Sequence, residues 1–240
     1  MARALTVFRV EEVIIYLDRG DREGAVYLKD LLEYADTPQY LRKRLIPVKA
    51  SLKYAGVLPP LRAPHHPTLG GRCFTPHYRE GVVVKRVGDK AWVDVGLEKL
   101  IVVRTSAKPG QRVTVRMAEK PRVVPKSEVP YYWGYSVTIT GGLREAVRIS
   151  GADVKIATSR LGQDVRTVLR ALKETLGASR RLLVAFGAHD RGLREIAEEE
   201  GVRLDELFDH VINFIPHQGS FTVRSEEALW VTLSILNTLT

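Results

Sequence analysis

The sequence has one cysteine, no long hydrophobic run and no signal-peptide pattern, and each absence excludes a class of protein. Cys73 alone cannot form an intramolecular disulfide, which excludes a disulfide-stabilised secreted domain. No run of about 18 consecutive apolar residues occurs, so no membrane span is expected. The first ten residues also lack the apolar centre of a signal peptide. We therefore expect a soluble protein of a reducing, cytoplasmic compartment.

Two familiar nucleotide-binding motifs are also missing. The run Leu183–Gly187 looks like a strand that ends in glycine, and Gly192 follows it. A P-loop needs Lys-Ser or Lys-Thr after the second glycine, whereas Leu193-Arg194 stands there. No expected strand is followed by Gly-x-Gly-x-x-Gly, which disfavours a Rossmann-type site. Taken alone, this segment is equally consistent with a tight strand-to-helix turn.

The charge that is present is unevenly distributed. The 240 residues carry a net charge of +9, and 45% of them are hydrophobic, which is sufficient for a core. Lys and Arg number 12 against 8 acidic residues in 1–72, 12 against 6 in 73–130, and 13 against 14 in 131–240. The positive charge is therefore concentrated in the first half and the middle of the sequence, which favours a polyanionic partner such as nucleic acid. An Arg-rich surface of a heat-stable protein is the alternative.

Patterns of apolar and turn residues indicate two domains. Strand patterns alternate with helix patterns through most of the chain, which is typical of an α/β domain with a parallel sheet. The strands are expected at 11–16, 135–140, 154–158, 182–186 and 211–215, and the helices at 26–34, 37–45, 164–176, 192–200 and 225–239. Runs at 81–87, 91–95, 100–104 and 112–117 are separated only by turns and indicate a small antiparallel barrel. We expect an α/β domain of residues 1–76 and 131–240, interrupted by a barrel of residues 77–130.

The segment from Asn213 to Ala228 is the richest in the chain. A strand leads into Pro216, and a polar loop containing glycine follows. Ser225 stands at an N-cap position, with glutamates in the first helical turn after it. Such a loop can wrap a small polar ligand with its backbone, although a satisfied turn is the commoner case.

Three segments, in this order, resemble the cofactor-binding loops of SPOUT methyltransferases. They are Thr158-Ser159, then Phe186-Gly187 with Gly192-Leu193, then Ile215-Pro216 with Gln218-Gly219-Ser220. Five further segments are similar to the archaeal and eukaryotic branch of SPOUT RNA methyltransferases that carries an OB-like insertion: Thr37–Lys43, Gly56–Leu61, Pro64-His65-His66, Arg79–Gly81 and Tyr132–Tyr135. The resemblance covers nearly the whole chain. It implies an α/β trefoil knot with a mostly parallel sheet, an OB-like barrel inserted in it, and a homodimer.

The resemblance also implies roles for residues. S-adenosylmethionine would lie bent among the three loops, bound by Thr158, Ser159, Phe186, Gly187, Gly192, Ile215, Pro216, Gln218, Gly219 and Ser220. Arg224 would orient a phosphate or base, and Glu226 would accept a proton, although helix-start electrostatics also accounts for this glutamate. Arg3 is eligible as well, because some SPOUT enzymes use an arginine on the first helix.

The implied substrate is ribosomal or transfer RNA, contacted by the barrel and by a basic cluster before it. The expected contacts are Arg42, Lys43, Arg44, Lys85, Arg86, Lys90, Arg104, Arg112 and Arg116. Trp92 is able to stack on a base, but an aromatic residue inside a strand more often belongs to the core. The same reasoning applies to Tyr131, Tyr132, Trp133 and Tyr135.

Three alternatives concern a metal site, the contact made by the last helix, and the function of the whole protein. His65, His66, Cys73 and His77 suggest zinc, but their spacing matches no common finger, and we expect no metal. The last helix is apolar around most of its circumference, which fits either a dimer contact or burial within the monomer. A non-catalytic RNA-binding or ribosome-assembly factor that keeps a SPOUT knot is the alternative function.

The first residues depart from the family pattern. SPOUT relatives of this branch begin with a hydrophobic strand and most of a helix, whereas this chain opens at Met1–Ala4, close to the end of that helix. Either the start codon is misplaced, or this version lacks one strand of the sheet.

Overall fold

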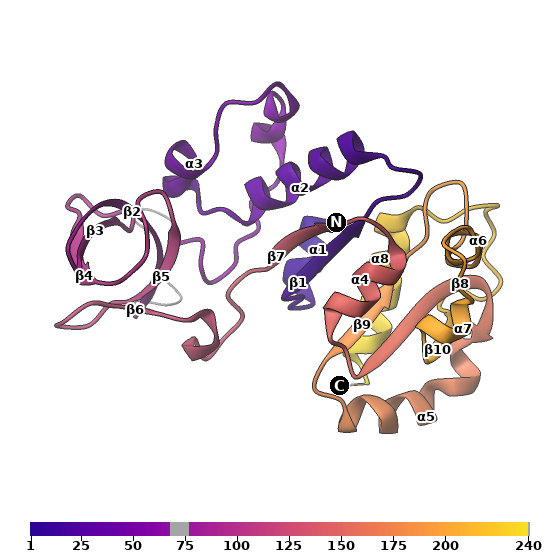
Figure 1. Ribbon diagram of the computed structural model, residues 1–240. Coiled ribbons are helices and arrows are strands. Elements are labelled where there is room, and N and C mark those ends of the chain that lie inside the picture. Colours follow the sequence, from indigo (N-terminus) through magenta and orange to yellow (C-terminus); the bar gives the residue numbers. More distant parts are fainter. Residues whose placement is uncertain (68–76, 240) are drawn as a thin grey trace.

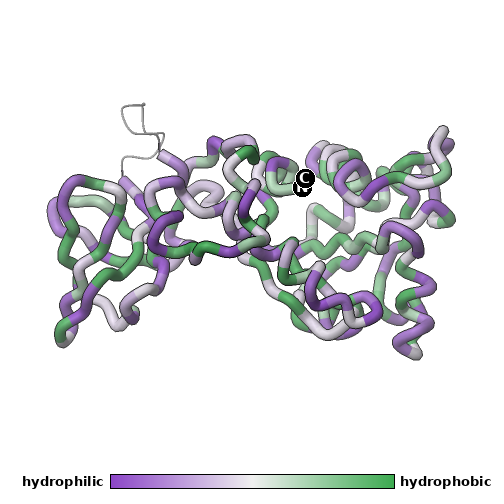
Figure 2. The backbone as a smooth tube through the Cα atoms, turned by 90° about the horizontal axis from the view of Figure 1, so that it is seen from above, coloured by the Kyte–Doolittle hydropathy of each residue, from purple (hydrophilic) through white to green (hydrophobic). Residues whose placement is uncertain are grey.

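The computed structural model describes residues 1–67 and 77–239, so Cys73 lies outside the described residues (Figure 1). A curled antiparallel sheet stands at one end and an α/β body at the other. The two are joined through the helices and loop that follow the first strand. Figure 2 shows the same elongated arrangement from above. No helix in the described part of the chain is long and apolar enough to cross a membrane.

The α/β body contains elements from both ends of the sequence. Before the curled sheet these are α1 (Ala2–Val7), β1 (Glu12–Tyr16) and α2 (Arg22–Asp36), and α3 (Gln39–Leu45) then lies beside the curled sheet (Figure 1). After it come β7 (Ser136–Thr140), α4 (Leu143–Ser150), β8 (Val154–Asp164), α5 (Val165–Ala178), β9 (Leu182–Ala185), α6 (Leu193–Glu199), α7 (Leu204–Leu207), β10 (His210–Asn213) and α8 (Ser225–Asn237). The expected alternation of strands and helices is therefore present, with α4 and α7 additional to it, and α1 lies where the resemblance placed the end of a helix.

The parallel strands form two sheets. β1 pairs with β7, and β8 lies between β10 and β9. Within the described residues no ladder joins β1 to β9. The expectation of one mostly parallel sheet is therefore met only in part, because the sheet is divided between these two strands.

Local signals explain several helix ends. The Asp21 carboxylate accepts a hydrogen bond of 2.9 Å from the Gly24 N–H and caps α2, which begins four residues earlier than expected. The Asp164 carboxylate caps α5 in the same way, through the Arg166 N–H. Gly151 ends α4 with a φ of 57°, a left-handed conformation that glycine adopts at little cost.

The curled sheet has five antiparallel strands in the order β4-β3-β2-β5-β6. They are β2 (Tyr78–Val87), β3 (Lys90–Asp94), β4 (Ile101–Arg104), β5 (Arg112–Arg116) and β6 (Arg122–Val124). Short 3-10 helices flank it: η1 (Ala50–Leu52), η2 (Ala55–Val57) and η3 (Lys126–Glu128). Its core is built from valines, chiefly Val83, Val93, Val103 and Val115. Four of the five strands were expected, and β6 was not. No ladder between β4 and β6 appears among the described strands, so the sheet is a curled half-barrel.

A buried polar cluster joins the curled sheet to the end of α2. Asp36 is 2% exposed and accepts hydrogen bonds of 3.0 Å from both His65 and Arg112. Arg112 also donates to the buried Glu80 carboxylate at 2.6 Å. Burial alone would raise the pKa of Asp36, but the hydrogen bond and charge of His65 and the Arg112 cation outweigh it and lower the pKa. This cluster fixes the sheet against α2.

Candidate cofactor site and RNA surface

Three loops meet at one edge of the three-stranded sheet. β10, β8 and β9 are parallel neighbours, so the loops after β9 and β10 and the part of β8 beyond Ala157, where its ladder with β9 ends, lie at the same edge, where open α/β sheets bind ligands. The Thr158 hydroxyl donates a hydrogen bond of 2.9 Å to the Ala185 carbonyl at the end of β9. The Asn213 side-chain amide donates to the Arg160 carbonyl at 2.9 Å. The three expected cofactor loops are thus brought together and tied to one another.

The first loop, residues 158–162, projects from the ladder. β10 pairs with Ile156 and Ala157 and then with Gln163 and Asp164, so the five residues between them leave the sheet. Gly162 packs against the β10 backbone, where an added Cβ would lie 2.8 Å from the Val211 carbonyl oxygen. Only glycine fits this close approach.

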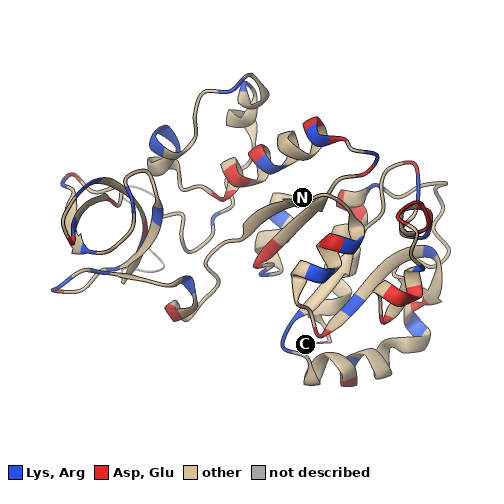
Figure 3. Ribbon diagram, in the orientation of Figure 1, with Lys and Arg blue, Asp and Glu red and all other residues tan. Residues whose placement is uncertain are grey.

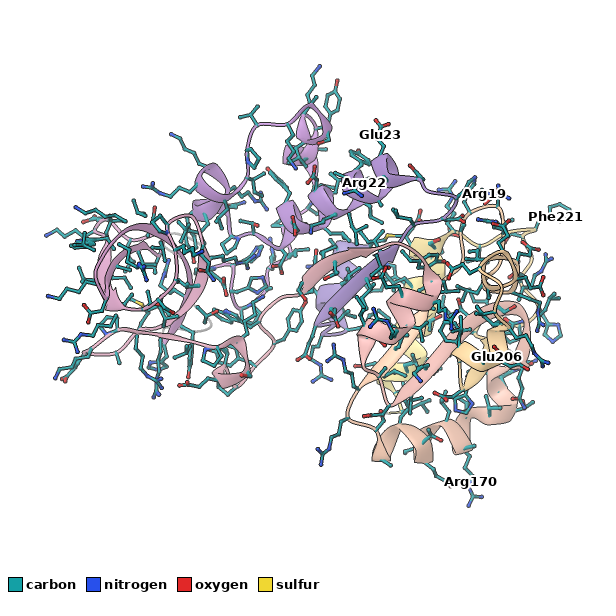
Figure 4. All side chains as sticks on the ribbon, in the orientation of Figure 1. Arg19, Arg22, Glu23, Arg170, Glu206 and Phe221 are labelled. Atoms are coloured by element: carbon teal, nitrogen blue, oxygen red, sulfur yellow. The ribbon has the colours of Figure 1, made fainter. Side chains whose placement is uncertain are left out.

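The third loop is shaped by its own side chains. The Asn213 carboxamide oxygen accepts from the Ile215 N–H at 2.9 Å. Gln218 donates to the Ser220 carbonyl at 2.9 Å, and the Ser220 hydroxyl donates to the Thr222 carbonyl at 2.8 Å. These bonds hold the loop in a defined turn. Phe221 is 93% exposed and points away from the body (Figure 4).

The second loop, residues 186–192, is held from the side of β1. The Tyr16 hydroxyl donates a hydrogen bond of 2.8 Å to the Phe186 carbonyl. Burial raises the pKa of Tyr16 to about 12, so this donor keeps its proton at neutral pH. The turn itself is tight, since a Cβ on Gly187 would lie 2.8 Å from the Arg191 carbonyl oxygen.

A second set of contacts fixes the same loop. The side chain of Arg191 is almost fully buried, with its guanidinium against the carboxylates of Asp18 and Glu199. Its Nε donates to Asp18 Oδ2 at 3.2 Å. Sequence reasoning did not single out Tyr16, Asp18 or Arg191. Which loop these residues face depends on the tertiary fold.

The expected catalytic residues are only partly brought together. Arg224 and Glu226 are both exposed and stand two residues apart in the sequence, where the third loop enters α8. Glu227 accepts a hydrogen bond of 3.0 Å from the Arg224 N–H and acts as a helix cap. No hydrogen bond engages the Glu226 carboxylate in the described part of the chain. The Arg3 guanidinium donates to the Leu61 carbonyl at 2.7 Å, so it is directed toward the segment that follows η2.

Most of the expected RNA contacts lie on the surface of the curled sheet and on α3 (Figure 3). Lys43 and Lys90 are exposed, and Arg104 is exposed beside Asp89. Four others are partly engaged: Arg42 over the Tyr34 ring, Arg44 with Asp94, Arg86 with the Ser106 carbonyl, and Arg116 near Glu128. Arg112 differs from all of these, because its donors are directed inward to Asp36 and Glu80. We therefore leave Arg112 out of the RNA surface.

The aromatic residues divide between the core and the surface. Trp133 and Tyr135 are buried, as expected, with Trp133 donating to the Thr114 hydroxyl at 3.0 Å. Trp92 is half-buried on the outer face of β3, and the Lys85 ammonium lies 4.9 Å from its ring centroid. The expectation that Trp92 belongs to the core is wrong. The strand alternation turns Ala91 and Val93 inward and leaves Trp92 outside.

Two of the three histidines considered for zinc have other hydrogen-bond partners. His65 Nε2 lies 3.0 Å from the Asp36 carboxylate, and His66 Nε2 lies 2.8 Å from the Asp36 carbonyl. Cys73 lies outside the described residues. Among residues 1–67 and 77–239, no group of three His, Cys, Asp or Glu side chains is placed to hold a metal ion.

The fold and site together define an α/β protein in which three loops meet at one sheet edge and an antiparallel sheet with Lys and Arg on its surface is attached. Residues 1–236 match the profile of the family described as "Putative RNA methyltransferase", and the chain belongs to this family.

Relatives of known name are similar over nearly the whole chain. A 28S rRNA (uridine-N(3))-methyltransferase of Drosophila melanogaster is 33% identical over 98% of this chain and 56% of its own length. The human protein of the same name is 32% identical over 98% of this chain and 70% of its own length. An uncharacterised protein of Halobacterium salinarum is 36% identical over 98% of this chain and 89% of its own length. The chain thus spans little more than half of the fly relative.

Proposed function

We propose that the protein is an S-adenosylmethionine-dependent methyltransferase that modifies a uridine of large-subunit ribosomal RNA at N3. Its family and the names of its relatives support RNA methylation at that atom. The observation that carries the proposal is the meeting of three loops at one sheet edge, tied by the Thr158–Ala185 and Asn213–Arg160 hydrogen bonds.

The loops fit a nucleoside cofactor. An added Cβ on Gly192 or Gly219 would meet no atom within 4 Å, so a ligand has room to approach the main chain there. Thr158, Phe186, Gly187 and the 215–220 loop would contribute the remaining contacts. When bound, the cofactor supplies a sulfonium methyl group that is already electrophilic.

The protein's own residues then have two tasks. Uridine N3 carries a proton at neutral pH, and it becomes a strong nucleophile only as that proton leaves. Glu226, whose carboxylate has no hydrogen bond in the described residues, would accept the proton at one of its oxygens. Arg224, two residues earlier, would hold a phosphate or the base in position.

RNA would lie across the curled sheet and α3. Exposed cations on this surface attract phosphates, and this affinity should fall with salt. The half-buried Trp92 ring beside Lys85 offers a surface on which a base can stack.

The proposal includes a trefoil knot and a homodimer. Support for the dimer comes from α1 and α8, where Val7 is 47% and Trp230 40% exposed while Leu229 and Leu236 are buried in the monomer. Phe8 and Trp230 contact each other edge to face, with ring centroids 5.5 Å apart. We call Val7, Phe8, Trp230 and Val231 the α1–α8 patch.

A matched pair of glycine substitutions tests the cofactor site. An added Cβ meets no atom at Gly219 or at Gly177, so both Gly219→Ala and Gly177→Ala should fold. Only Gly219 lies in a cofactor loop, and its variant should bind S-adenosylmethionine at least about 10-fold more weakly, which is roughly 1.4 kcal/mol. Isothermal titration gives the result.

Methyl transfer needs a separate assay. The wild type should transfer radioactive methyl groups from S-adenosylmethionine to ribosomal RNA. No binding of the cofactor by the folded wild type would contradict the proposal. Binding without transfer to any cellular RNA would favour a non-catalytic assembly factor.

A further inference from the structure

Residues 46–62, which follow α3, form an arm beside α2. The arm contains only the short helices η1 and η2, and Figure 1 shows it looping out from the chain between α3 and the curled sheet. Its first part is anchored on α2, because the Lys49 ammonium donates to one Asp30 carboxylate oxygen at 2.7 Å and the Ser51 hydroxyl lies 3.4 Å from the other. These contacts give the arm a defined place in the fold.

The arm lies in a part of the sequence that has no negative charge. The 43 residues from Thr37 to Arg79 contain eight Lys or Arg and no Asp or Glu. The average of the whole chain would place about five acidic residues in a run of this length. Figure 3 shows Lys and Arg along α3 and the arm. Such a surface is complementary to a polyanion.

The arm also exposes apolar side chains. Val48 is fully exposed, Tyr54 is 72% exposed and Val57 is 83% exposed. Single exposed apolar residues are common, but three within ten residues mark a contact surface. The partner that fits this surface combines negative charge with flat apolar groups. Unpaired nucleotides of RNA have both.

Tyr54 is paired with a lysine in the same way as Trp92 on the curled sheet. The Lys53 ammonium lies 5.2 Å from the Tyr54 ring centroid, and the Lys85 ammonium lies 4.9 Å from that of Trp92. In each pair a base can stack on the ring while the ammonium contacts a neighbouring phosphate.

α3 connects the arm to the curled sheet. Its Arg44 guanidinium donates to the Asp94 carboxylate of β3 at 2.6 Å, and the arm begins directly after this helix. The arm is therefore continuous with the surface on which we place RNA.

We propose that the arm is a second contact for single-stranded RNA, in which an unpaired base stacks on Tyr54 and Lys53 binds the adjoining phosphate. The proposal rests on the RNA substrate of the proposed function and adds to it a binding site outside the curled sheet and α3. One strand held at both Trp92 and Tyr54 gains affinity, because the second contact is intramolecular once the first has formed.

Substitutions of Tyr54 test the stacking contact. Fluorescence anisotropy is measured with a labelled oligouridylate of about 20 nucleotides, long enough to extend beyond one barrel-sized site. Tyr54→Ala and Tyr54→Leu should each bind about 10-fold more weakly than the wild type, whereas Tyr54→Trp should bind at least as tightly. Tyr27→Ala is the matched control, because this exposed tyrosine shares a hollow with Asp21, Glu23 and Asp30, which repel phosphate. Equal urea midpoints establish that all variants fold.

Two further measurements locate the contact. Lys53→Met should lower the salt dependence of binding by about one counterion. An oligonucleotide that carries 4-thiouridine should, after irradiation, crosslink to a peptide that contains Tyr54, as identified by mass spectrometry.

The results separate this proposal from the proposed function. Wild-type affinity in Tyr54→Ala, a loss equal to that of Tyr27→Ala, or crosslinks only outside the arm would overturn the arm contact and leave methyl transfer untouched. Wild-type affinity in Tyr54→Leu would overturn it as well, because the surface would then serve as an apolar contact for another kind of partner. RNA binding through Tyr54 by a protein that binds no S-adenosylmethionine would support the arm contact and contradict the proposed function.

Discussion

Tyr16 and Phe186 are 170 positions apart in sequence, and the Tyr16 hydroxyl donates a hydrogen bond of 2.8 Å to the Phe186 carbonyl. The bond joins the end of β1 to the loop that follows β9. It therefore couples the two sheets at the edge where the three proposed cofactor loops meet.

Tyr16→Phe removes this bond and little else. We expect a loss of about 1 kcal/mol in the free energy of unfolding, because one buried hydrogen bond is lost. Cofactor affinity should fall by roughly 3- to 10-fold, since the second loop loses an anchor. Urea denaturation and isothermal titration measure the two effects. Tyr27→Phe, on an exposed tyrosine of α2, is the control, and equal behaviour of the two variants would contradict this role.

His66 should make stability depend on pH between about 4 and 6.5. Burial, with the neighbouring His65 charge, lowers the pKa of His66 to about 4, whereas in the unfolded chain it is about 6.5. Between these values the unfolded chain binds the extra proton, so falling pH should cost stability, by roughly 3 kcal/mol at most. His66→Gln should flatten this slope in urea denaturation measured from pH 4.5 to 7. Parallel slopes in variant and wild type would refute the assignment.

Arg112 and Arg104 should behave oppositely when each is changed to Met. Arg112→Met leaves Asp36 and Glu80 buried without their cation and should cost about 3–5 kcal/mol of stability. Arg104→Met, at an exposed position, should cost under about 0.5 kcal/mol but lower the salt dependence of RNA binding by about one counterion. Urea midpoints and filter-binding titrations across salt concentrations provide the comparison. An Arg104 variant as unstable as the Arg112 variant would be inconsistent with the structure.

Trp230→Glu should disrupt the proposed dimer. The substitution places a charge in the α1–α8 patch, where Trp230 is 40% exposed in the monomer. Light scattering after size exclusion should give twice 26.9 kDa for the wild type and the monomer mass for the variant. Val48→Glu, on a fully exposed residue outside the patch, should remain dimeric. A monomeric wild type would contradict the proposed dimer.

The sequence was sufficient for the order of elements but not for their long-range contacts. Alternation of apolar residues predicted most strands, and the loops after Ala157, Ala185 and Asn213 were expected because parallel strands end at a common edge. Short helices such as α1, with six residues, give too little periodicity to recognise.

The errors have a common physical origin. Arg112 looked like a surface cation, but its position on β5 turns it toward the buried carboxylates of Asp36 and Glu80. Trp92 was expected in the core because aromatic residues inside strands usually are. In β3 the inward positions belong to Ala91 and Val93, so the Trp92 ring lies on the outer face. Which face of a strand is buried depends on the register of its neighbours, and a single sequence does not contain that register.

The central claim is methylation of uridine N3 in large-subunit ribosomal RNA, and nucleoside mass spectrometry tests it most directly. The RNA is purified from a strain lacking the gene, from its parent, and from the deletion strain complemented with wild type or with Glu226→Gln. We predict 3-methyluridine in the parent and in the wild-type complement, its absence from the deletion strain, and at least about a 100-fold lower rate of formation with Glu226→Gln in a time course on purified RNA. Undiminished 3-methyluridine in the RNA of the deletion strain would contradict the account.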